Sequence, residues 1–184
     1  MRRKRYEQKS IILSGSPRKG GNSDILCDEF LRGAQEVGNE AEKIFVRSKK
    51  IAPCMACYYC RDHEGACAIR DDMAEILDKM QAFDVIVLAS PVYFYSIDAQ
   101  MKAVIDRCLA RWTNIPNKEF YYIVTCADTD RAATETTLAC FRGFAVCLKG
   151  AKEKGVIYGT GAYEPGSIRS LSAMKEAYEM GKTV

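Results

Sequence analysis

The most constraining feature of the sequence is an apolar run near its centre, Asp84-Val-Ile-Val-Leu-Ala89. The run shows no alternation of polar and apolar residues, so a strand formed from it would be buried on both faces, as in parallel sheets covered by helices. Other short apolar runs recur along the chain, and segments with apolar residues at helical spacing separate them. This order predicts an open, doubly wound parallel sheet.

The predicted elements occupy one domain over residues 1–184. We expect strands at residues 10–13, 42–46, 84–89, 120–125 and 156–158. We expect helices from Asn22 to Gly38, from an Asp72 cap with Glu75 three residues later, from about Asp98, and over residues 132–149 and 167–180. The buried face of the helix after Asp98 is expected to carry five residues: Met101, Val104, Ile105, Cys108 and Trp112.

Charge and hydropathy exclude two classes of protein. The net charge is +3, but the four basic residues at positions 2–5 supply +4, so the remainder carries −1. A nucleic-acid binder would carry a basic face on its folded domain. No apolar run approaches the roughly 20 residues of a membrane helix, and no signal-peptide core is visible. We therefore expect a cytoplasmic protein that binds neither nucleic acid nor membrane, with residues 1–9 as a flexible basic tail.

The loop after the first predicted strand, Ser14 to Ser23, has the composition of a phosphate site. It lacks the lysine of a nucleotide-binding P-loop and the spacing of a dinucleotide fingerprint. It supplies hydroxyls, one amide, one guanidinium and the free N–H groups of a helix start, which suit a terminal phosphate. A glycine-rich turn with a serine cap is the alternative interpretation of this loop alone.

The loop after the third strand, Ser90 to Ser96, contains three consecutive aromatic residues. Ligands of such sheets bind beyond the carboxyl ends of the strands, where this loop lies. A planar ring ligand needs flat apolar surface and backbone N–H donors, both of which the loop can provide. An aromatic cluster in a subunit interface is the alternative, and the two are compatible.

Three sequence segments together resemble NAD(P)H-dependent FMN reductases of the flavodoxin-like fold. They are Gly15-Ser-Pro-Arg-x-x-Gly-Asn-Ser23, Ser90-Pro-Val-Tyr-Phe94, and Met101-Lys102 with Asp106-Arg107. The resemblance implies a three-layer sandwich with a five-stranded parallel sheet in the order 2-1-3-4-5. It also implies FMN, with phosphate contacts from Ser14, Ser16, Arg18, Asn22 and Ser23, ring contacts from Pro91, Val92, Tyr93 and Phe94, and Thr125 beside the flavin. The loop after Thr125 matches the family less well.

Four cysteines are concentrated in residues 53–70, a loop after the second strand. Cys54, Cys57, Cys60 and Cys67 have the spacing C-x2-C-x2-C-x6-C. Four thiolates suit either structural zinc or an iron–sulfur cluster, and the tight triple spacing favours the cluster. His63 is an alternative zinc ligand. The remaining cysteines are expected to be small core residues, because most lie in apolar patterns: Cys27, Cys108, Cys126, Cys140 and Cys147.

Within the flavodoxin-like family, such a compact cysteine motif resembles that of the iron–sulfur flavoproteins, which carry a [4Fe–4S] cluster with FMN. Cluster-free flavin reductases also keep a similar loop, ending like Cys67 to Met73, where it packs over the active site or at a dimer interface. The resemblance implies an enzyme that passes electrons between NAD(P)H or reduced ferredoxin and an acceptor, as a homodimer or homotetramer. The alternatives are a cluster-free FMN or quinone reductase and a non-catalytic electron carrier. No side chain is assigned as a catalytic acid or base.

Overall fold

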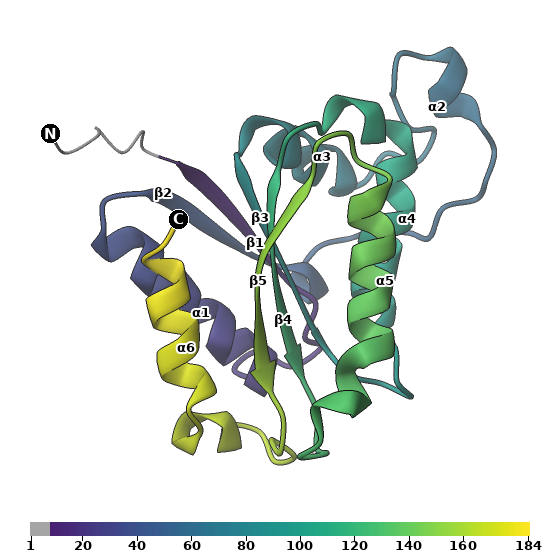
Figure 1. Cartoon of the computed structure of the whole chain (residues 1–184). Helices are drawn as coiled ribbons and strands as arrows, with labels where there is room; N and C mark the ends of the chain where they lie inside the picture. The colour runs from purple at the N-terminus through teal and green to yellow at the C-terminus, as the bar shows by residue number, and fades with distance from the viewer. Residues whose placement is uncertain (1–7) are drawn as a thin grey trace, which may run out of the picture.

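The computed structural model describes residues 8–184, which form a five-stranded parallel sheet in the order β2-β1-β3-β4-β5 (Figure 1). This order confirms the flavodoxin-like architecture. The strands are β1 (Lys9–Ser14), β2 (Glu40–Phe45), β3 (Val85–Pro91), β4 (Glu119–Thr125) and β5 (Lys152–Gly159). Lys9 is thus a strand residue rather than part of a tail, and residues 1–7 lie outside the described part of the chain.

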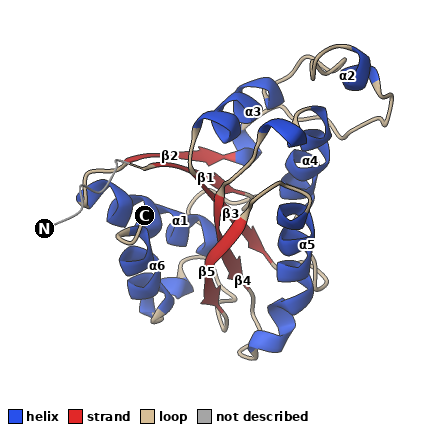
Figure 2. Cartoon of the chain, turned by 45° about the horizontal axis from the view of Figure 1, so that its top comes forward, coloured by secondary structure: helices blue, strands red, loops and turns tan. Residues whose placement is uncertain are grey.

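Helices cover both faces of the sheet (Figures 1 and 2). One face carries α1 (Asn22–Glu36) and α6 (Ala173–Gly181), and the other carries α3 (Met73–Ala82), α4 (Ala99–Arg107) and α5 (Glu135–Val146). Short 3₁₀ turns extend several helices: η2 (Cys108–Ala110), η3 (Trp112–Asn114), η4 (Arg131–Thr134) and η5 (Ser167–Ser170). The cysteine loop contains one helical turn, α2 (Tyr59–Asp62). No helix within residues 8–184 is long and apolar enough to span a membrane.

The central strands are apolar throughout because their residues alternate between two cores. Ile86 and Leu88 of β3 belong to the core beneath α3, α4 and α5. Val87, between them, belongs to the core beneath α1 and α6. Each of the three side chains is fully buried, as expected for a strand covered on both faces. The run that predicted a parallel sheet is therefore the centre of both cores.

The start of α3 differs from the predicted capping box. Asp72 occupies the cap position, but its side chain makes no capping hydrogen bond. It accepts the Lys50 N–H at 2.7 Å, while Asp71 accepts the Met73 N–H at 3.1 Å. Glu75 pairs with lysines instead of reaching back to the cap. The carboxylates at this point tie the cysteine loop to the helix, a long-range role that local spacing does not reveal.

The buried face expected after Asp98 is shorter than predicted. Met101, Val104 and Cys108 are buried, whereas Ile105 is only half-buried. Trp112 was wrongly placed in the core: α4 ends at Arg107, the chain turns through η2 and η3, and 42% of Trp112 is exposed. A second correction concerns Cys147, which follows α5 and is exposed, unlike the buried Cys27, Cys108 and Cys126.

Candidate functional site

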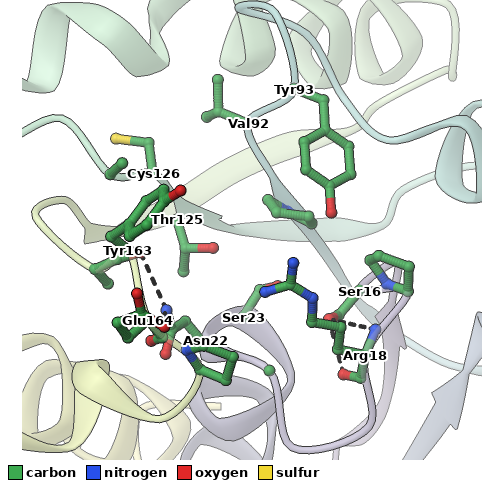
Figure 3. Close-up of a pocket in the computed structure, with 16 residues that line it drawn as sticks. Ser16, Arg18, Asn22, Ser23, Val92, Tyr93, Thr125, Cys126, Tyr163 and Glu164 are labelled. Atoms are coloured by element: carbon green, nitrogen blue, oxygen red, sulfur yellow. Dashed lines mark hydrogen bonds between the residues drawn. The ribbon is translucent and has the colours of Figure 1, made fainter.

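A cleft of about 380 Å³ lies beyond the carboxyl ends of β1, β3, β4 and β5. This is the position at which open parallel sheets bind ligands. Figure 3 shows Tyr93 and Tyr163 on opposite sides of the cleft. All of the predicted flavin-contacting residues except Ser14 and Phe94 line it: Ser16, Arg18, Asn22, Ser23, Pro91, Val92, Tyr93 and Thr125.

The polar end of the cleft is the turn that leads from β1 into α1. The Ser16 hydroxyl donates to the Arg18 carbonyl at 2.9 Å and accepts the Arg18 N–H at 3.2 Å. Gly21 N–H also donates to the Arg18 carbonyl, at 3.0 Å. These bonds fold the turn back so that the first N–H groups of α1 border the cleft beside buried Ser23. Unpaired N–H groups and the positive end of the helix dipole favour an anion here.

A buried carboxylate, that of Asp24, stabilises this turn through hydrogen bonds and an ion pair. The carboxylate of Asp24 accepts hydrogen bonds from the Ser14 hydroxyl at 2.8 Å and from the Gly20 N–H at 2.9 Å, and it pairs with Lys43 at 2.9 Å. Burial alone would raise the pKa of Asp24, but the bonds from Gly20, Lys43 and Ser14 hold it below its ordinary value. The Ser14 hydroxyl thus faces Asp24 and supports the turn, and Ser14 does not line the cleft, so its contact with a phosphate remains a prediction.

The side chain of Asn22, which also lines the cleft, is bound by the loop between β5 and α6. Its amide donates to the carbonyls of Ala162 and Glu164, at 3.1 and 3.0 Å. Its amide oxygen accepts the N–H groups of Gly166 and Ile168, at 2.9 and 3.4 Å. The side chain thus fastens the loop between β5 and α6 to the start of α1, and only the backbone N–H remains for an anion.

The Asn22→Ala substitution is expected to lower the free energy of unfolding by about 1–3 kcal/mol, because backbone groups of the β5–α6 loop, including those of buried Ala162 and Ile168, lose their hydrogen bonds. The same substitution should weaken FMN binding, since Tyr163 and Glu164 lose their anchor. Urea unfolding and fluorescence titration with FMN measure the two effects. The exposed Asn114→Ala variant is the control, and equal stability of the two variants would contradict the anchoring role.

The loop after β3 presents two residues to the cleft and turns the next two away. Val92 N–H donates to the Thr125 carbonyl at 2.8 Å, and Tyr93 and Ser96 exchange backbone hydrogen bonds at 2.9 and 3.0 Å. Phe94 and Tyr95, between them, have φ of +49° and +60°. A two-residue hairpin turn requires such positive angles, and it leaves Phe94 fully exposed at the tip. Phe94 therefore does not line the cleft of its own chain, and its contact with the flavin ring remains a prediction.

Asp98 links the loop after β3 to the turn after β1. Its carboxylate accepts the Ser90 hydroxyl at 2.7 Å and the Met101 N–H at 2.9 Å, while its own N–H donates to Ser90 at 2.9 Å. It also lies against Gly15, where an added Cβ would collide with the carboxylate. The residue is almost completely buried, and burial raises the pKa of the carboxyl above its ordinary value.

The raised pKa of Asp98 predicts a pH dependence. The folded protein holds this proton more tightly than the unfolded chain, so the contribution to stability is full below the ordinary pKa of 3.8 and is lost as pH rises through the folded value. Relative to Asp98→Asn, the natural protein should therefore lose stability as the pH rises above the ordinary pKa of 3.8. Urea unfolding as a function of pH measures the difference, and a flat or rising difference would contradict it. Asp106→Asn, on the exposed side of α4, is the control.

Sequence reasoning missed one wall of the cleft, the loop after β5. Four of its residues line the cleft, Ala162, Tyr163, Glu164 and Pro165, and the loop after β4 adds Cys126 and Ala127. The same rule of strand carboxyl ends would have found this loop had it been applied to the fifth strand. Cys126 is buried, which raises the pKa of its thiol, and its Sγ donates to the Asp128 carbonyl at 3.3 Å.

The cysteine loop forms a separate site. Cys54, Cys57, Cys60 and Cys67 all line one hollow of about 20 Å³, next to Arg107. Within residues 8–184, no group of three or more Cys, His, Asp or Glu side chains is gathered closely enough to hold a metal ion. The donor set still suits a thiolate-ligated metal group, because four cysteines line the same hollow. Its volume holds about one water-sized sphere, so the loop must open to admit more.

His63 is turned away from this role. Its ring stacks on Tyr59 with centroids 3.6 Å apart, and its Nδ1 lies 2.9 Å from the Tyr59 carbonyl oxygen. His63 also does not line the hollow shared by the four cysteines. The side chain therefore stabilises the short α2 turn, and the sulfur atoms are the donors that this loop offers.

The two sites lie at opposite ends of the molecule. Figures 1 and 2 both show α2 far from the carboxyl ends of β4 and β5, where the cleft is found. The cleft and the cysteine hollow share no lining residue. The cysteine loop therefore does not cover the cleft of its own chain, contrary to one of the expectations for a cluster-free reductase.

Comparison with known proteins gives a family match. A family model described as NADPH-dependent FMN reductase matches residues 9–148. An iron–sulfur flavoprotein of Methanosarcina thermophila is 46% identical over 95 residues, which cover 52% of this chain and 49% of that protein. An iron–sulfur flavoprotein of Methanocaldococcus jannaschii is 46% identical over 99 residues, covering 54% and 51%. The matched region thus spans about half the length of these curated relatives.

Solved structures share the fold over nearly the whole chain. An NAD(P)H:quinone oxidoreductase from Methanothermobacter marburgensis superposes with a TM-score of 0.72 at 16% identity, covering 97% of this chain and 96% of that one. An FMN-dependent NADH-azoreductase from Bacillus anthracis, solved with FMN, gives a TM-score of 0.73 at 16% identity and covers 95% and 98%. At such identities the likeness concerns the fold alone.

Proposed function

The chain belongs to the NADPH-dependent FMN reductase family, and we propose that it is an FMN-dependent oxidoreductase of the iron–sulfur flavoprotein type. The observation that carries the proposal is the division of the cleft into two chemically different parts. One part is the Ser16–Ser23 turn at the start of α1, and the other is formed by Pro91, Val92 and the tyrosines on either side. A phosphate suits the first part, and a planar ring suits the second.

The cleft fits FMN in size and in polarity. Its volume of about 380 Å³ lies within the range of roughly 300–1,000 Å³ that is common for small-molecule pockets. The Arg18 guanidinium supplies positive charge, while the Ser23 hydroxyl and the N–H groups of α1 supply donors. A Cβ at Gly21 would approach the Ser16 hydroxyl to 2.7 Å, so this position keeps the phosphate end open.

The bound flavin would supply the redox chemistry, taking up two electrons from a donor and passing them on. The chain's own residues bind and orient it. Val92 N–H is held by the Thr125 carbonyl, which fixes the backbone at the ring end, and Tyr93 and Tyr163 limit access of water from both sides. No acid or base is assigned, because neither the cleft geometry nor the chemistry requires one.

We further propose that Cys54, Cys57, Cys60 and Cys67 hold a [4Fe–4S] cluster, which would exchange single electrons with the flavin. The support is the hollow that the four cysteines line together and the similarity to proteins named iron–sulfur flavoproteins. Because the hollow and the cleft lie at opposite ends of one chain, exchange between them would join two copies of the chain. A homodimer or homotetramer is therefore part of the proposal.

The donor is tested by anaerobic stopped-flow reduction of the flavin-loaded protein. We expect NADPH or NADH to bleach the flavin absorbance at a rate that is comparable with the turnover numbers of flavin enzymes. A dye or quinone acceptor should then restore the absorbance. If only reduced ferredoxin bleaches the flavin, the pyridine-nucleotide reductase assignment is wrong. A cluster-free FMN or quinone reductase is the second candidate, favoured by the small volume of the cysteine hollow, and iron analysis separates the two.

A further inference from the structure

Arg107, at the end of α4, is buried at the base of the cysteine loop. Only 2% of its side chain is exposed. Its Nη1 donates to a carboxylate oxygen of Asp71 at 2.7 Å, and its Nη2 donates to the other oxygen at 2.9 Å. Such a two-pronged pair fixes both the position and the plane of the guanidinium.

The same guanidinium holds both ends of the loop together. Nη1 also donates to the Ala52 carbonyl at 2.8 Å, just before the first cysteine, and Nη2 donates to the Ile69 carbonyl at 3.3 Å, just after the last one. Asp71 completes the closure by accepting the Ala52 N–H at 2.9 Å. The loop is therefore closed at its base by one ion pair, whatever its cysteines bind.

One nitrogen of the Arg107 guanidinium takes no part in these hydrogen bonds. Among the described residues, Nε of Arg107 is a buried nitrogen without a hydrogen-bond partner. Arg107 lines the hollow that the four cysteines share, and it lies beside Cys67 at a second hollow as well. A buried N–H without an acceptor is costly, and an anionic sulfur group in the hollow would supply the missing acceptor.

We propose that Arg107 is the positioning residue of the cysteine site: it closes the loop at Ala52 and Ile69 and directs positive charge and its free N–H at the sulfur-bound metal group. This inference rests on the proposed metal binding by the four cysteines. Hydrogen bonds to the sulfurs and the net charge around an iron–sulfur group are levers that set its reduction potential. Removal of the cation should therefore favour the oxidised form and loosen the site.

Four variants test the inference: Arg107→Gln, Arg107→Lys, Asp71→Asn combined with Arg107→Gln, and Arg111→Gln as the control. Arg111 contacts the same loop at the Gly65 carbonyl, 3.4 Å from its Nε, but it does not line the cysteine hollow. The double variant removes both buried charges, so it leaves no unpaired carboxylate. If the ion pair served only to avoid an unpaired buried charge, the double variant should hold iron as well as the natural protein does. If Arg107 acts on the loop and the metal group, the double variant should still lose iron faster.

Each variant is reconstituted anaerobically, and iron loss to a chelator and the midpoint potential are measured. In Arg107→Gln we expect iron loss to be about tenfold faster, and the reduction equilibrium to shift about tenfold toward the oxidised form, which is about 59 mV for one electron. In the double variant, which also removes the negative charge of Asp71, we expect equally fast iron loss but a smaller shift of the equilibrium. Arg107→Lys should have a midpoint potential close to that of the natural protein but should still lose iron faster. Arg111→Gln should match the natural protein in both measurements. Unchanged iron loss and potential in Arg107→Gln would overturn the inference.

A metal-free measurement separates failure of this inference from failure of the proposed cluster. If the natural protein takes up no iron or sulfide, the cluster is wrong, and hydrogen exchange of the apoprotein then decides about Arg107. Faster exchange at residues 52–69 in the double variant, but not in Arg111→Gln, would support the loop closure. Equal exchange in both variants would refute it. Retained FMN binding shows that each variant is folded.

Discussion

The Gly15→Ala variant is expected to bind FMN about 100-fold more weakly than the natural protein, a loss of about 2.8 kcal/mol in binding free energy. A Cβ at this position would collide with the Asp98 carboxylate and would lie 2.8 Å from the Ala89 carbonyl oxygen. Gly15 N–H also donates to that carbonyl at 2.8 Å, which ties the phosphate turn to β3. Neither obstacle can give way easily, because Ala89 is strand backbone and Asp98 is held by Ser90 and Met101.

The turn itself must therefore move away from β3, and the Ser23 hydroxyl and the first N–H groups of α1 move with it. Overpacking of this kind usually costs about 1–3 kcal/mol, so the variant should remain folded but be less stable. Fluorescence titration with FMN measures the affinity, and urea unfolding measures the stability. Gly143→Ala is the matched control, since a Cβ there meets nothing within 4 Å. FMN affinity within threefold of the natural value would show that the turn does not bind the phosphate.

Replacement of Cys57 and Cys60 with serine is expected to abolish iron binding while FMN remains bound at one per chain. The reason is that serine keeps the size of the side chain but removes the soft thiolate that iron–sulfur clusters require. FMN should be unaffected because the cleft and the cysteine hollow share no residue. Iron and acid-labile sulfide assays after anaerobic reconstitution measure the first effect, and flavin absorbance measures the second.

Cys147→Ser is the control for this experiment. Cys147 is exposed, as Cys54 and Cys57 are, but it lies outside the loop at the end of α5. It should keep the iron content of the natural protein. Undiminished iron in the Cys57→Ser, Cys60→Ser protein would mean that these cysteines are not ligands, and loss of FMN along with the iron would mean that the two sites are not independent.

The sheet was predictable to the extent that its strands are buried on both faces. Every residue of β3 from Val85 to Ser90 is buried, and its apolar run predicts the strand closely. The edge strand β5 is longer than predicted, because its first residues, Lys152 to Lys154, are exposed and carry no apolar signal. The whole strand pairs with β4, but only its second half contributes to the cores. Local patterns thus find central strands better than edges.

The site was predictable in its location but not in all of its contacts. The strand-end rule and the loop composition placed most of the lining residues correctly. The side-chain partners of Ser14 and Asn22 could not be predicted because they are set by the fold: Asn22 binds residues that are 140 or more positions away along the chain. The exposure of Phe94 could not be predicted because it follows from the hairpin turn, which has positive φ. The contacts of these three residues with FMN remain predictions. Such backbone geometry is not encoded in residue type.

The central claim is that this chain carries FMN in its cleft and a [4Fe–4S] cluster on its four loop cysteines. An anaerobic absorption spectrum of the purified protein, with FMN, iron and sulfide assays on the same sample, tests it most directly. We predict flavin bands on a broad cluster absorbance, with about one FMN, four iron and four sulfide per chain. Flavin bands alone, without iron or sulfide even after anaerobic reconstitution, would contradict the claim.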